Sequence, residues 1–265
     1  MYAQAAIKPN TLLRNGATHI VMRGVQKCTC AGASLRDRNA LSLCCIKLDT
    51  ATDPACGSGG MFIQSGDFVN AMGMNANSAM TFYGQEKVEY NAKLCLMNMA
   101  VHGLTGVIKS GDEANSFYHD AHNLNGCCDY VMANPPFNVD KVKSETCENA
   151  GRLPFGMPGI NKSKEVGNAN YLWISYFYSY LNEKGRAGFV MASSATDSQG
   201  KDKNIRERLV RTGHVDAMIS VGNNFFYTKS LPCSLWFFDK GKATLLKIRY
   251  FLLMRETTIQ WLTVH

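Results

Sequence analysis

The sequence IKLDTATDPACGSGGMFIQSGDFVN, residues 46–70, decides how the chain folds. It predicts a strand from Ile46 to Asp53, then a glycine-rich turn, then a helix from Met61 to about Asn70. Glycines in such a turn let the backbone approach a ligand closely, and N–H groups at a helix start favour anionic groups. The turn lacks the Gly-Lys-Ser/Thr of a phosphate-binding P-loop. Phe62 also stands where a dinucleotide-binding fingerprint needs its third glycine.

Short apolar strands and amphipathic helices continue to alternate after this stretch. The alternation is typical of an α/β protein with a largely parallel sheet. We predict a three-layer α/β domain over residues 46–240, with helices on both faces of a mostly parallel seven-strand sheet whose last strands form an antiparallel pair. Residues 1–45 form an unassigned N-terminal segment, and residues 241–265 a divergent C-terminal tail. The other predicted strands are 80–86, 107–112, 128–134, 186–192, 215–221 and 234–238, and the other predicted helices are 87–102 and 171–181.

The composition indicates a globular, reduced protein. The chain of 265 residues is 46% hydrophobic, 18% charged and 10% aromatic, which excludes disorder along its whole length. Its best candidate for a membrane span, Tyr171–Leu181, has eleven residues where a bilayer needs about 20. Residues 1–10 lack the pattern of a signal peptide. We therefore expect a cytoplasmic protein with no membrane partner, and we expect its ten scattered cysteines to be free thiols.

The net charge and the cysteine spacing indicate which ligands the protein is expected to bind. The net charge of +7 fits an anionic partner such as nucleic acid. Cys28, Cys30, Cys44 and Cys45 lack the two-residue gap of a zinc site, so no metal is expected. An irregular segment of 33 residues between Asn138 and Asn170 carries Arg152 and several lysines, and it reads either as a solvated loop or as one that contacts phosphates.

Acidic residues end the next two predicted strands. In doubly wound folds an acid at the place of Glu86 accepts hydrogen bonds from ribose hydroxyls. Taken alone, Glu86 is better explained as an acid at a helix start, and Asp112 as a turn residue after Gly111.

The run Asp129-Tyr-Val-Met-Ala-Asn-Pro-Pro-Phe137 suggests a chemistry. Two consecutive prolines stiffen the chain where it leaves a buried strand, so they fix Asn134 and the neighbouring carbonyls at the sheet edge. An exocyclic amine has two N–H donors, which an Asn oxygen and a backbone carbonyl can accept together. Phe137 offers a flat surface for a base swung out of its stack.

These motifs resemble those of adenine-N6 DNA methyltransferases. The resemblance rests on Asp53–Gly60, Tyr83–Glu86 and Asn134–Phe137 in that order. Asp53–Phe62, Gly167–Asn170 and the stretch from Phe226 to Phe237 resemble more narrowly the modification subunit of type I restriction systems. The similarity covers about residues 50–240. The chain lacks that family's aromatic-Thr-Pro tripeptide before the turn, and we expect it to be incomplete at both ends relative to the family.

The resemblance implies a Rossmann-like fold that uses S-adenosylmethionine as methyl donor and no metal. Its implied partners are DNA, a specificity subunit and a restriction subunit. The glycine turn and Asp53 would surround the methionine part of the donor, Glu86 would bind the ribose hydroxyls, and Asp112 would lie near the adenine amine. The implied donor-binding residues are Asp53, Pro54, Ala55, Gly57, Gly59, Gly60, Glu86 and Asp112, and the implied catalytic residues are Asn134, Pro135, Pro136 and Phe137.

Two alternatives stay open at this point. A methyltransferase that acts on protein glutamine uses the same Asn-Pro-Pro turn, because a glutamine amide presents the same two donors, although such enzymes usually have Tyr at the place of Phe137. The second alternative is a catalytically silent fragment that only docks with partner subunits.

Overall fold

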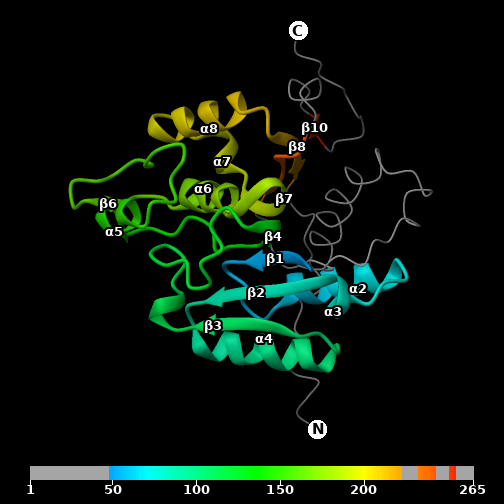
Figure 1. Ribbon diagram of the computed structural model, residues 1–265. Helices are drawn as coiled ribbons and strands as arrows, with labels where there is room; N and C mark the ends of the chain where they lie inside the picture. Colours follow the sequence, from blue (N-terminus) through cyan, green and yellow to red (C-terminus); the bar gives the residue numbers. More distant parts are fainter. Residues whose placement is uncertain (1–47, 223–231, 243–250, 255–265) are drawn as a thin grey trace.

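The computed structural model describes residues 48–222 and 232–242, and the backbone of residues 251–254 (Figure 1). Its main feature is an eight-stranded sheet in the order β10-β8-β9-β7-β4-β1-β2-β3. The strands are β1 (Asp49–Asp53), β2 (Met80–Glu86), β3 (Gly106–Ser110), β4 (Cys128–Ala133), β7 (Leu181–Ala192), β8 (Val215–Val221), β9 (Cys233–Asp239) and β10 (Phe251–Met254). The helices are α2 (Gly60–Ala71), α3 (Ala76–Ala79), α4 (Glu89–Val101), a 3-10 turn η2 (Asp112–Ala114), α5 (Ser144–Asn149), α6 (Asn170–Tyr180), α7 (Ser194–Asp197) and α8 (Lys201–Arg211).

The pairing of the strands confirms the predicted topology. β1 lies between β2 and β4 and runs parallel to both, and β4 is parallel to β7. β9 runs antiparallel to both of its neighbours, β7 and β8. The seven predicted strands are all present, and β10 adds an eighth beside β8, parallel to it.

Side chains on the central strands alternate between two cores, one on each face of the sheet. On β4, Val131 and Ala133 belong to the core under α6 and α8, whereas Met132 points to the core under α2 and α4. The same alternation places Phe189 and Val190 of β7 in different cores. Because a strand points successive residues to opposite faces, both faces must be covered. Helices on both faces are therefore confirmed (Figure 1).

The structure corrects three local predictions. β7 begins at Leu181, directly after α6, and not at Arg186 as predicted. A Cβ atom at Gly185 would lie 2.6 Å from the carbonyl oxygen of Cys128, so only glycine lets β7 approach β4 this closely. Asp112 does not end β3 but opens η2. The irregular segment 138–170 contains α5 and a small two-stranded sheet of β5 (Val142–Lys143) and β6 (Glu165–Val166).

Arg152 in that segment is a buried residue and not a solvated base. It is 3% exposed, donates to the hydroxyl of Tyr180 (2.9 Å) and the carbonyl of Ser116 (2.8 Å), and lies over the ring of Tyr176. It therefore joins the segment to the body of the domain.

No helix in the described ranges is long and apolar enough to cross a membrane. The six cysteines within those ranges are free thiols, as predicted. Cys28, Cys30, Cys44 and Cys45 lie outside the described residues.

Candidate active site

The carboxyl ends of β1, β2 and β4 lie at one edge of the sheet, because the three strands are neighbours and parallel. Asp53 at the end of β1 is level with Gly84 of β2, so Glu86 lies two residues beyond it. Asn134 directly follows β4 on the other side of β1. The strand order changes direction between β1 and β4, and open α/β sheets bind their ligands at such a point.

The glycine turn is fastened to the neighbouring strand by backbone hydrogen bonds. The N–H of Cys56 donates to the carbonyl of Gln85 (3.1 Å), and the N–H of Gly57 donates to Oε2 of Glu86 (3.0 Å). Buried Asp53 accepts the N–H of Ala55 at 2.9 Å and so closes the start of the turn. Pro54 is buried and Ala55 is partly exposed. These bonds hold the glycine turn against the end of β2 and against Glu86.

Two glycines of the turn have different surroundings. Gly59 has φ +79°, and a Cβ built there would lie 2.7 Å from the sulfur of Cys95 on α4. Gly60, the first residue of α2, would meet nothing within 4 Å. Gly59 is thus required by packing and backbone conformation, whereas Gly60 borders open space.

Glu86 keeps part of its capacity to accept hydrogen bonds. Its Oε1 accepts the N–H of Val88 (2.8 Å) in addition to the Gly57 bond on Oε2. Each carboxylate oxygen can accept two bonds, so the described residues leave one position open on each. The carboxylate of Asp112 is exposed at the start of η2, and no described residue bonds to it.

The turn after β4 presents an unused amide. Asn134 is half-buried, and its side chain makes no hydrogen bond to any residue that the structure describes. Pro135 is buried, Pro136 is exposed, and Phe137 is half-buried between the two cores. A polar side chain that is partly removed from water and has no partner is suited to bind an incoming group.

Cys56 is not a nucleophile in this site. A hydrogen bond with Cys95 and, next, burial raise the pKa of the Cys56 thiol, so it stays protonated at neutral pH. The reactive form of a cysteine is the thiolate, so the thiol is a packing group here.

Comparison with known proteins assigns the chain to a family. The N-6 DNA Methylase family matches residues 43–260. The chain belongs to the N-6 DNA methylase family. It is 34% identical over 206 residues to the type I restriction enzyme MjaIX methylase subunit of Methanocaldococcus jannaschii, covering 76% of this chain and 35% of that protein. It is 30% identical to the HindI methylase subunit of Haemophilus influenzae, covering 72% of this chain and 41% of that protein.

Solved structures agree with this fold. The methyltransferase subunit of a type I restriction-modification system from Streptococcus thermophilus superimposes with a TM-score of 0.68 at 18% identity, covering 97% of this chain and 49% of that one. The EcoKI M protein gives a TM-score of 0.57 at 17% identity, covering 94% of this chain and 48% of that one. The chain thus spans between a third and a half of the length of these relatives.

Gln85 is a buried residue that the sequence analysis quoted only as part of Tyr83–Glu86, without a role. It is 2% exposed, donates to Ser116 Oγ (3.0 Å) and the carbonyl of His119 (3.1 Å), and accepts the N–H of Ala121 (3.1 Å). The chain after β3 is therefore shaped around one amide. The signal in the sequence was a polar residue inside an otherwise apolar strand, directly before Glu86.

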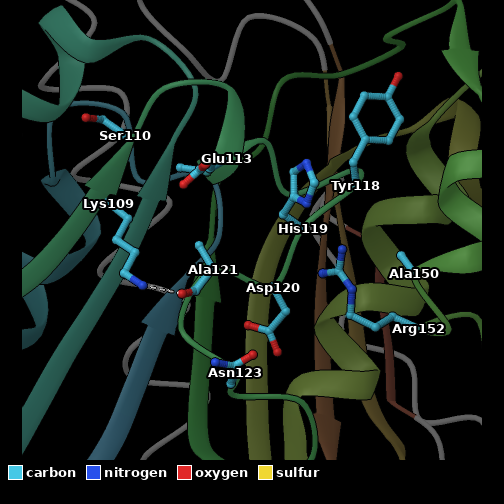
Figure 2. Close-up of a pocket in the computed structure, with 11 residues that line it drawn as sticks. Lys109, Ser110, Glu113, Tyr118, His119, Asp120, Ala121, Asn123, Ala150 and Arg152 are labelled. Carbon is cyan, nitrogen blue, oxygen red and sulfur yellow. Dashed lines mark hydrogen bonds between the residues drawn. The ribbon is translucent and has the colours of Figure 1, made fainter.

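A cavity of 660 Å³ lies beside the predicted site and does not coincide with it. Figure 2 shows Lys109 crossing to the carbonyl of Ala121, with Asp120 and Arg152 on the other side. None of the predicted donor-binding or catalytic residues lines the cavity, which lies between β3, the chain after η2 and the end of α5. The predicted residues instead gather along the strand ends.

Proposed function

We propose that this chain carries the catalytic domain of a type I modification subunit, which transfers a methyl group from S-adenosylmethionine to N6 of adenine in DNA. Membership of the N-6 DNA methylase family and the names of the relatives support the proposal. The observation that carries it is the half-buried amide of Asn134, which has no partner among the described residues and lies at the same sheet edge as the glycine turn and Glu86.

The residues present fit S-adenosylmethionine, which supplies an electrophilic methyl group on a sulfonium when bound. The open space at Gly60 lets a ligand approach the backbone, and no Cβ fills it. The free acceptor positions on Glu86 suit two ribose hydroxyls, and the exposed carboxylate of Asp112 suits an amine. In this proposal Asp53, Pro54, Ala55, Gly57 and Gly59 shape the turn around the methionine part.

On the acceptor side, the chain orients the amine. The oxygen of Asn134 and the carbonyl of Pro135 accept its two N–H groups, which directs the nitrogen lone pair toward the methyl carbon. Pro136 fixes the turn, and Phe137 stacks on the flipped adenine. The N–C bond forms as the S–C bond breaks, and the displaced amine proton leaves to water. Orientation supplies most of the rate.

The family favours adenine over protein glutamine as the acceptor. Phe137, in the place where glutamine methyltransferases usually have Tyr, supports the same choice. The whole protein's partners are also part of the proposal: a specificity subunit that reads the DNA sequence, and a restriction subunit that joins for cleavage. Because its substrate is DNA, we propose that it acts in the cytoplasm.

Two measurements test this function. Calorimetric titration of the folded chain with S-adenosylmethionine should show binding that survives Asn134→Ala. Labelled donor should transfer its methyl group to DNA lacking N6-methyladenine, and Asn134→Ala should abolish the transfer. A folded chain that does not bind the donor is a silent fragment, and label in protein of a cell extract instead of DNA identifies the glutamine alternative.

A further inference from the structure

Three asparagines connect the start of α6 to the residue that follows Phe137. Asn170, the first residue of α6, is 3% exposed, and its Oδ1 accepts the backbone N–H of Asn138 at 2.9 Å. Its Nδ2 donates to Oδ1 of Asn138 at 2.9 Å, and Nδ2 of Asn168 donates to the same oxygen at 3.0 Å. We call Asn138, Asn168 and Asn170 the asparagine cluster.

Backbone donors fix the orientation of the amides in the asparagine cluster. An N–H can only donate, so the atom of Asn170 that faces the N–H of Asn138 must be oxygen, and its nitrogen then faces Asn138. Oδ1 of Asn168 is identified in the same way by the N–H of Asn170, at 2.9 Å. The network can therefore form with only one arrangement of donors and acceptors.

Helix capping explains only one bond of the asparagine cluster, the one from the N–H of Asn170 to Oδ1 of Asn168. The N-cap of α6 is Ala169, and both amide atoms of Asn170 bond to Asn138 and not to the helix that Asn170 begins. Asn138 has φ +53°, a left-handed conformation that non-glycine residues adopt rarely. A further bond from the N–H of Ala169 to the carbonyl of Val139 (2.9 Å) extends the connection by one residue. A buried helix start thus imposes an unusual conformation on the residue next to Phe137.

We propose that Asn170 and Asn168 are positioning residues for methyl transfer. They lock Asn138 in its left-handed conformation, and this holds Asn134 and Phe137 in the geometry that receives the adenine. The inference rests on the proposed function. The inference gives the Gly167–Asn170 motif a role, because none of its residues is among the proposed donor-binding or catalytic residues.

The test compares Asn170→Ala with Asn77→Ala in the full chain. Asn77 donates to the carbonyl of Gly103 (2.8 Å) and accepts from the N–H of Thr105 (3.0 Å), but it lies in α3, before the amino end of β2. Asn77 is therefore a suitable control, because it also makes long-range side-chain hydrogen bonds but lies at the amino ends of the strands, away from the proposed site. For each variant we would measure kcat, KM for DNA, donor Kd, and amide exchange of peptides covering residues 134–140.

We expect Asn170→Ala to lower kcat about 100-fold, the loss typical of a small misplacement of reacting groups, with donor Kd within about twofold of the parent. Exchange over residues 134–140 should accelerate in this variant and stay unchanged in Asn77→Ala, which keeps its kcat. If Asn170→Ala does not fold, Asn168→Ala is the second variant. It removes one hydrogen bond to Asn138 and the bond accepted from the N–H of Asn170, and it should lower kcat about tenfold.

The result that overturns the inference is a kcat within about threefold of the parent in the folded asparagine variants, or an equal loss of kcat in Asn77→Ala. A parent chain that methylates nothing is a different failure, because it removes the proposed function itself and the inference with it. The two failures are distinguishable, since the first appears only in the variants.

Discussion

Alanine substitutions at two neighbouring glycines of the turn should have different effects: Gly59→Ala should lower stability, and Gly60→Ala should weaken donor binding. At Gly59, a side chain must adopt φ +79°, which costs about 1–2 kcal/mol, and its Cβ would lie 2.7 Å from the sulfur of Cys95, an overpacking that costs about 1–3 kcal/mol. We therefore expect Gly59→Ala to lower the free energy of unfolding by about 2–5 kcal/mol.

Gly60→Ala should have the opposite profile. The new methyl group would meet nothing within 4 Å and would occupy the first position of α2, so stability should stay level or rise by up to about 1 kcal/mol. The methyl group would, however, take the space that we assign to the donor. S-adenosylmethionine should bind at least about tenfold more weakly, a loss of about 1.4 kcal/mol.

Urea unfolding followed by circular dichroism measures the first effect, and calorimetric titration with the donor measures the second. The double variant Gly59→Ala, Cys95→Ala should recover the overpacking part, because the sulfur that the new Cβ meets is gone. Ordinary surface substitutions change the free energy of unfolding by up to about 0.5 kcal/mol. A change no larger than about 0.5 kcal/mol in Gly59→Ala would therefore refute the packing argument. Parental donor affinity in Gly60→Ala would refute the placement of the donor at the turn.

Three other predictions use different assays. Phe137→Ala should weaken methylation through the loss of about 1–3 kcal/mol of stacking while Phe137→Trp keeps part of the activity, and equal rates for Phe137→Ala and the parent would reject the flipped-base role. Burial lowers the pKa of His122 below 6.5, against a hydrogen bond to the carbonyl of Gly84 that raises it. As the pH falls through 6.5, the unfolded chain binds a proton at His122 before the folded protein does. The melting temperature should therefore fall from pH 6.5 down to the folded-state pKa of His122. His122→Gln should reduce this fall, and an equal fall in the variant and the parent would contradict the role of His122. The purified chain should bind duplexes weakly, with a steep loss in added salt and no sequence preference, and a hundredfold preference for one duplex in competition binding would contradict the proposed division of labour between subunits.

Local patterns in the sequence predicted most of the sheet. The strands 80–86 and 215–221 match β2 and β8 to the residue. Placing Asp53, Glu86 and Asn134 at strand ends was enough to bring them to one edge, since neighbouring parallel strands end on the same side.

The missed features depend on contacts between residues that are distant in the sequence. β7 extends back to Leu181 because Gly185 allows it to approach β4, which the polar run of residues 182–185 does not indicate. The hydrogen-bond partners of the Gln85 side chain lie between Ala114 and Ala121. The side chain of Asn170 bonds to Asn138, which is 32 residues away. β10 pairs with β8 from within a tail that showed no pattern. Arg152 lies in a segment that the sequence left open as solvated or phosphate-contacting, and the structure buries it against two aromatic rings.

The position of β1 between β2 and β4 has a consequence for how the chain is made. A ribosome completes residues 49–110, with β1, β2 and β3, before β4 exists. Until then the side of β1 that later binds β4 is an open strand edge, which can pair with another chain. Asp129 closes it, since its carboxylate accepts the N–H of Thr50 on β1 and the side-chain amide of Asn182 on β7, both at 2.8 Å. Translation that pauses between β3 and β4 therefore leaves this edge of β1 unpaired, and the edge closes only when β4 has left the ribosome and Asp129 can bind Thr50.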